Sequence, residues 1–103
     1  MKKHNEQIIS KDGYLQTFSM QREIYEECHV EIILYRPNNK QQKIFFRDVR
    51  DMKIGRLDNL CVPLITVSDV SSYQWENIKY RVYDDENDLF SFYCRGYTVE
   101  GSN

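Results

Sequence analysis

A histidine flanked by two glutamates is the part of this sequence closest to an arrangement for catalysis or metal binding. Glu27, His29 and Glu31 occupy alternate positions, and side chains two residues apart on a β-strand point to the same side. An imidazole beside two carboxylates could hold a metal ion or act as a general base. A metal site needs further ligands, and the other histidine, His4, lies in the N-terminal tail. We therefore interpret this face as solvated or partner-facing, with no metal ligand and no catalytic residue.

An acidic run near the C-terminus is the second candidate. Its acids are Asp84, Asp85, Glu86 and Asp88. The run resembles a calcium loop but lacks the loop glycine and the terminal bidentate glutamate of such a site. We expect a solvated hairpin tip, which could also serve as an acidic contact for a protein partner.

No other motif indicates a reaction. The chain has no G-x-S-x-G elbow and no glycine-rich phosphate loop, and we expect no cofactor. Tyr73 and Trp75 precede the last predicted hairpin, where exposed aromatic rings could stack on a sugar or contact a partner. A sugar- or small-molecule-binding β domain is therefore an alternative function. A small hydrolase that uses His29 is a less favoured one.

Composition bounds the class of protein. The 103 residues are enough for one domain with one modest core, and we expect residues 1–7 to form a flexible tail. The net charge of −2 argues against a general nucleic-acid binder. Charge is nevertheless segregated, because residues 23–31 hold four glutamates and no Lys or Arg, whereas residues 40–56 are mainly basic. Separated patches of this kind can steer a charged partner.

The cysteines and the N-terminus indicate a compartment. Cys28, Cys61 and Cys94 form an odd set without a CxxC pair, so we predict three free thiols buried within strands. The N-terminus lacks the apolar stretch of a signal peptide, and no apolar run is long enough to span a membrane. We therefore expect a cytoplasmic protein without a membrane partner.

Alternating apolar residues predict an antiparallel β protein. Strands are predicted over residues 14–21, 24–35, 43–49 and 60–68, and as a long hairpin over 76–99. Asp12-Gly13 between apolar residues predicts a further hairpin turn. Pro63 indicates an edge strand or a bulge. Residues 50–59 are predicted to form an irregular connection or one helical turn, because Gly55 disfavours a helix.

These elements predict an all-β, mainly antiparallel fold. We expect a β-sandwich or half-open barrel of six to seven strands with at most one short helix. Its buried residues are predicted from the alternation to be Cys28, Val30, Ile32, Ile44, Phe46, Ile78, Tyr80, Val82, Phe90 and Phe92.

Two stretches resemble a known class of proteins. They are residues 43–49, KIFFRDV, and residues 67–76, VSDVSSYQWE, which continue into YRVYD at 80–84 and FSFYC at 90–94. Together they resemble small β-rich bacterial immunity proteins encoded beside polymorphic or contact-dependent inhibition toxins. The resemblance implies an inhibitor without a catalytic residue. It also implies that the partner is a cognate toxin domain, often a nuclease with a basic cleft.

The segregated charge suggests where such a toxin would bind. An acidic surface can occlude a basic cleft, and aromatic anchors slow dissociation. We expect no direct contact with nucleic acid. The predicted partner-binding residues are Glu27, Glu31, Tyr83, Asp84, Asp85, Glu86, Asp88 and Tyr97.

Overall fold

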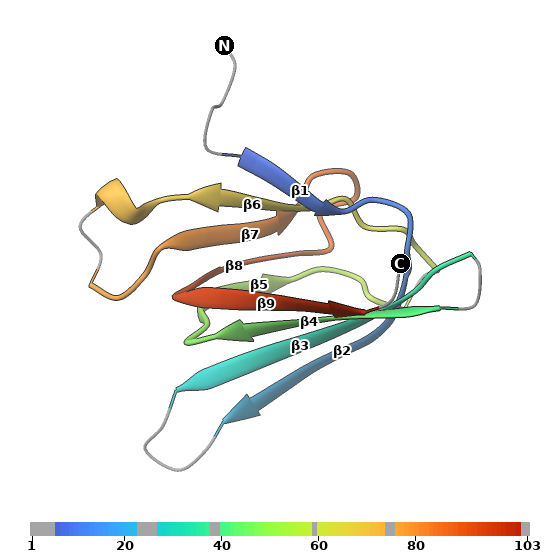
Figure 1. The fold of residues 1–103 in the computed structure, drawn as a ribbon, viewed down its shortest axis with the longest axis horizontal. Coiled ribbons are helices and arrows are strands. Elements are labelled where there is room, and N and C mark those ends of the chain that lie inside the picture. The colour runs from blue at the N-terminus through green and yellow to red at the C-terminus, as the bar shows by residue number, and fades with distance from the viewer. Residues whose placement is uncertain (1–5, 23–26, 38–39, 59, 74–75, 102–103) are drawn as a thin grey trace.

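The protein is a sandwich of two antiparallel sheets (Figure 1). The computed structural model describes residues 6–22, 27–37, 40–58, 60–73 and 76–101. The five-stranded sheet has the order β1 (Glu6–Ser10), β6 (Ile65–Asp69), β7 (Tyr80–Asp84), β8 (Phe90–Cys94) and β5 (Arg50–Ile54). The four-stranded sheet has the order β2 (Tyr14–Arg22), β3 (Cys28–Tyr35), β4 (Gln41–Arg47) and β9 (Gly96–Gly101). A single 3₁₀ turn, η1, covers Ser71–Tyr73 within the described ranges.

The core lies between the two sheets and follows the period-two pattern of the sequence. On β3, every second side chain from Cys28 to Leu34 is buried, while Tyr35 is exposed. Phe46 of β4 meets Phe92 of β8 edge to face, with ring centroids 5.0 Å apart, so this contact joins the two sheets. Nine of the ten predicted core residues are buried, and the tenth, Tyr80, is half-buried.

The structure places a strand where an irregular connection was predicted. Residues 50–54 form β5, which pairs with β8 at the edge of the five-stranded sheet. The register shifts between Arg50 and Lys53, and Asp51 has a φ of 55°. A bulge of this kind breaks the alternation of side chains. The prediction for 50–59 was wrong at its start because the bulge hides the period-two pattern.

The hairpin predicted at Asp12-Gly13 is also wrong. Strand β1 pairs with β6, whereas β2 pairs with β3, so the connection crosses from one sheet to the other. A Cβ placed on Gly13 would lie 2.9 Å from the Cβ of Leu34. Gly13 is therefore needed for close packing at the crossing.

The predicted C-terminal hairpin is half right. Strands β7 and β8 are paired, but the chain then turns at Arg95, and β9 joins β4 in the opposite sheet. The backbone N–H of Arg95 donates to the carbonyl of Arg47 at 2.9 Å, which holds this corner against the end of β4. One long predicted strand is thus two strands, which partly explains why the sandwich exceeds the predicted six to seven.

Two further boundaries differ from the predictions. Pro63 lies before β6 rather than in it, and β6 is an inner strand between β1 and β7, so the edge or bulge assignment was wrong. Glu6 and Gln7 belong to β1 rather than to a flexible tail, because they pair with Ser68 and Val67. Residues 1–5 lie outside the described ranges, as do residues 24–26 of the predicted strand over 24–35.

Candidate partner-binding surfaces

The segment between β7 and β8, which carries the acidic run, is held in place by Asp84. The Asp84 side chain is only 3% exposed. One carboxylate oxygen accepts the N–H groups of Leu64 and Glu86 at 2.9 and 3.0 Å, and the other accepts those of Asn87 and Leu89 at 3.3 and 3.1 Å. A carboxylate that satisfies backbone donors in this way is a structural group. Asp84 therefore does not supply the exposed partner contact that the sequence suggested.

The remaining acids of this turn are displayed on a fixed backbone. Asp85, Glu86 and Asp88 are exposed. The N–H of Asp85 donates to the carbonyl of Leu64 at 3.0 Å, and the N–H of Gly55 donates to the carbonyl of Leu89 at 2.7 Å. The turn is thus attached to two other segments, which lowers the entropy cost of using it as a contact. We refer to Asp85, Glu86 and Asp88 as the acidic turn.

Tyr83 is engaged within the protein. It is 8% exposed, and its hydroxyl donates a hydrogen bond to the Glu6 carboxylate. The Arg81 guanidinium lies 4.3 Å from the centre of its ring. Burial, and then the hydrogen bond to Glu6, raise the pKa of Tyr83 to about 12. These contacts attach β1 to β7 across β6 and leave Tyr83 little free surface for the anchoring role predicted for it.

The glutamates around His29 are paired with cations. Arg95 makes a two-pronged ion pair with Glu27, with N–O distances of 3.0 and 3.1 Å. Lys43 lies 3.9 Å from Glu31. The Nδ1 atom of His29 accepts the backbone N–H of Asp48 at 3.4 Å. In the described ranges, no three His, Cys, Asp or Glu side chains come together in a way that could hold a metal ion.

Apart from Glu31, which lies within β3, the predicted partner-binding residues fall near the two ends of β8. The acidic turn precedes Phe90, the first residue of β8, whereas Glu27 pairs with Arg95, which follows the last residue of β8. In Figure 1 the connection from β7 and the corner that leads to β9 lie at opposite ends of β8. Tyr97 lies at the second end, half-buried, with its ring edge to face against Tyr80 at 5.3 Å. The structure therefore does not bring all the predicted residues into one surface.

A groove at the second end was not predicted from the sequence. Arg47, Lys79 and Arg95 line an open depression together with Tyr80, Gly96 and Tyr97, which we call the cationic groove. Its basic residues come from β4, from the segment before β7 and from the β8–β9 corner. They are separated by up to about half the chain, so no local pattern marks the cluster. The turn of the chain at Arg95 is what brings them together.

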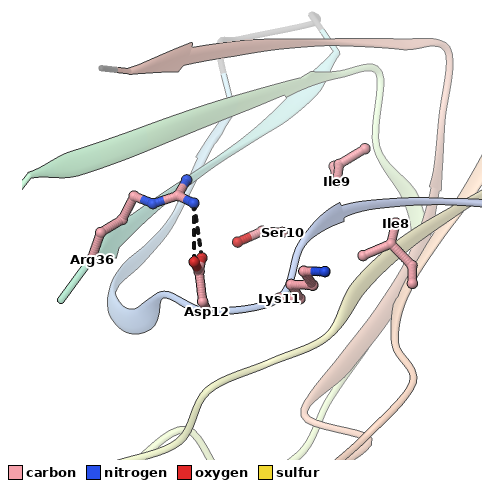
Figure 2. Close-up of a pocket in the computed structure, with 6 residues that line it drawn as sticks. All are labelled: Ile8, Ile9, Ser10, Lys11, Asp12 and Arg36. Atoms are coloured by element: carbon pink, nitrogen blue, oxygen red, sulfur yellow. Dashed lines mark hydrogen bonds and ion pairs between the residues drawn. The ribbon is translucent and has the colours of Figure 1, made fainter. Parts of the chain in front are cut away.

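A second hollow lies where the chain crosses between the sheets (Figure 2). In Figure 2 the Arg36 guanidinium faces Asp12, with an ion-pair distance of 2.9 Å. The Ser10 hydroxyl is buried and has no hydrogen-bond partner among the described residues. None of the six residues that line this hollow is aromatic. It therefore differs from the aromatic pocket that a sugar-binding function would require. Of the two aromatic residues predicted for that function, Tyr73 ends η1 and Trp75 lies outside the described ranges.

Fold and surfaces together define a small antiparallel β-sandwich with exposed acids at one end of β8 and a cationic groove at the other. No described helix is long and apolar enough to cross a membrane. Comparison with known families shows the class of protein more specifically than the fold does. The model of the family described as "Immunity protein PIM8" matches residues 3–100. The chain belongs to this immunity protein family. No curated protein and no solved structure matches it.

Family membership confirms the predicted resemblance to small immunity proteins. It indicates an inhibitor rather than an enzyme and is consistent with neutralisation of a toxin. The second face of β3 was predicted to be solvated or to cover a partner. It carries half-buried His29, Glu31 and Ile33 and exposed Tyr35.

Proposed function

We propose that this protein binds a cognate toxin domain and blocks its active site with the acidic turn. The observation that carries the proposal is the Asp84 carboxylate, which fixes the turn by accepting four backbone N–H groups. Family membership supplies the class of partner. A nuclease is the toxin that we propose, because an enzyme that binds phosphodiesters needs a basic cleft, to which a rigid acidic turn is complementary.

Charge complementarity between the acidic turn and a basic cleft predicts fast association. Complementary charge raises the rate of encounter well above the ~10⁵–10⁶ M⁻¹s⁻¹ of neutral surfaces, and added salt screens the effect. Charges at the rim of an interface act mainly on this rate, whereas charges buried in the complex act on dissociation. Because Asp85, Glu86 and Asp88 are exposed in the free protein, they are available to act at the encounter step.

The test is to reverse the acidic turn while keeping Asp84. A triple variant, Asp85→Lys, Glu86→Lys and Asp88→Lys, should slow association with the cognate toxin domain by about 10- to 100-fold at low salt. Glu100→Lys is the control, since Glu100 is an exposed acid on β9, in the opposite sheet from the turn. It should change the rate far less. Stopped-flow association at several salt concentrations and protection of cells from the toxin are the measurements.

Three results would separate the possibilities. A slower, less salt-sensitive association of the triple variant supports the acidic turn as the contact. An unchanged rate, with a complex still formed, would place the contact elsewhere on an immunity protein. A wild-type protein that neither binds nor protects against the toxin domain would overturn the proposed function itself.

A further inference from the structure

The cationic groove has chemistry opposite to that of the acidic turn. Its open volume is about 450 Å³, and three of its six lining residues are basic. Within the described part of the chain, neither Arg47 nor Lys79 has a carboxylate at ion-pair distance, whereas Arg95 is paired with Glu27. Arg47 and Lys79 are therefore available to bind an anion in the groove, whereas Arg95 is already paired with Glu27.

The fold positions the Arg47 guanidinium. One of its nitrogens donates to the Thr98 hydroxyl at 3.1 Å on the neighbouring strand β9. A Cβ built on Gly96 would lie 2.5 Å from the other terminal nitrogen, so the guanidinium occupies space that only a glycine leaves open. An arginine held in this way can present its planar fork to a carboxylate without first losing rotamer entropy.

Lys79 and the tyrosines complete the groove. The backbone of Lys79 is held on both sides, since its N–H donates to the carbonyl of Cys94 at 3.1 Å and its carbonyl accepts from Val70 at 2.8 Å. Tyr80 and Tyr97 pack edge to face and also line the groove. Cations together with neutral donors are the groups that carboxylates accept from.

Among the residues that the structure describes, the nearby acids are already engaged with other groups. Glu27 is held by Arg95, and Asp48 by Arg50 at 3.2 Å. The pKa of Asp69 is lowered mainly by hydrogen bonds from Ser71 and, to a smaller extent, by the Lys79 ammonium. Asp69 is therefore the one carboxylate that these contacts place near Lys79, and it is already engaged with Ser71.

We propose that the cationic groove binds an acidic segment of the partner protein. This inference rests on the proposed function, and it adds a contact of opposite sign at the other end of β8. An acidic turn and a basic groove at opposite ends would let the immunity protein select a toxin domain by the pattern of its charges. Like charges brought together by the wrong orientation or the wrong partner oppose binding.

A short polyglutamate peptide is the probe for the groove. In NMR titrations it should shift the backbone amide of Gly96 and the Nε–H signal of Arg47. The double variant Arg47→Gln, Lys79→Gln should weaken peptide binding by about fivefold or more. Lys53→Gln, Arg56→Gln removes the same charge away from the groove and should weaken it by less than about twofold.

Gly96→Ala tests geometry at constant charge. The added methyl must displace the end of the Arg47 side chain, which can rotate away without moving the backbone, so the fold should survive while the guanidinium moves. Weaker peptide binding by this variant, with an unchanged unfolding midpoint, would support the groove. Equal loss in both double variants, no shift at Gly96, or no effect of Gly96→Ala on binding would overturn it.

Binding of other anions and of the toxin tests the groove and the proposed function separately. Stronger binding of inorganic phosphate or of a single-stranded oligonucleotide than of polyglutamate would overturn an acidic protein segment as the occupant. If the wild-type protein binds its toxin and Arg47→Gln, Lys79→Gln binds it equally well, the groove proposal fails and the proposed function stands. If the peptide binds the groove but no toxin domain binds the protein, the proposed function fails instead.

Discussion

Asp84 accepts the backbone N–H of Leu64 at 2.9 Å, although the two residues are 20 positions apart in the chain. The contact attaches the start of the acidic turn to the segment that leads into β6. The same carboxylate also accepts the N–H of Leu89, beside the start of β8. One buried side chain thus holds three parts of the five-stranded sheet together.

Replacing Asp84 should therefore destabilise the whole domain. Asp84→Ala leaves several backbone N–H groups without an acceptor and should lower the free energy of unfolding by about 3–5 kcal/mol. Asp84→Asn keeps one acceptor oxygen and should cost less. Asp85→Ala is the control, because Asp85 is exposed. Urea unfolding would measure all three variants, and equal effects of Asp84→Ala and Asp85→Ala would contradict the structural role.

The two glycines at crossings between the sheets should differ in their tolerance of a methyl group. Gly13→Ala brings a Cβ against the Cβ of fully buried Leu34, which cannot move without shifting backbone. We expect it to cost about 1–3 kcal/mol of unfolding free energy. Gly96→Ala meets only the end of the Arg47 side chain and should cost far less. Thermal unfolding compares the pair, and a larger loss at Gly96 would contradict the packing argument.

Ser10→Ala should stabilise the protein. The Ser10 hydroxyl is buried with no partner among the described residues, so the folded state loses its hydration without a compensating bond. Removing the oxygen should raise the free energy of unfolding by about 1 kcal/mol. Ser71→Ala, which instead removes a hydroxyl bonded to Asp69 at 2.7 Å, should not stabilise. A less stable Ser10→Ala protein would indicate that the hydroxyl has a partner in solution.

Alkaline pH should destabilise the domain through Tyr83. Burial raises the pKa of this residue to about 12 from the ordinary value of 10.0. The unfolded chain therefore loses the phenol proton first, and the stability contributed by Tyr83 is complete below pH 10 and disappears as the pH rises to about 12. Tyr83→Phe should show a flatter loss over this window in urea unfolding, whereas exposed Tyr35→Phe should follow the wild type.

The three cysteines should react as free thiols with unequal rates. All are free in the structure, with Cys28 and Cys94 buried and Cys61 half-buried. Burial raises the pKa of the Cys94 thiol to about 12, which suppresses the reactive thiolate. A thiol reagent should therefore modify Cys61 first in the native protein and all three after denaturation. Only one reactive thiol in the denatured, non-reduced protein would demonstrate a disulfide.

The core could be predicted because strand alternation is local. Residues such as Val30, Ile32 and Phe92 are buried where period two places them. The antiparallel character also follows from short strands joined by short turns. The resemblance to immunity proteins came from two stretches of sequence, and the family match confirms it.

Strand pairing was decided by contacts that are distant in the chain. No residue near Asp12-Gly13 indicates that β1 pairs with β6, more than fifty residues later, rather than with β2. The cationic groove arises in the same way, because the chain changes sheets at Arg95 and only then brings Arg47 beside Tyr97.

Local sequence was thus enough to predict the strand-rich composition, the inward-facing residues and the acidic character of the segment between β7 and β8. Which acid of that segment is buried depends on the assembled fold, because Asp84 finds its donors in Leu64 and Leu89 only after β6, β7 and β8 have come together. The periodicity of a strand depends on neighbouring residues alone. Whether a carboxylate becomes a buried hydrogen-bond acceptor or an exposed contact depends on which groups the rest of the fold places beside it.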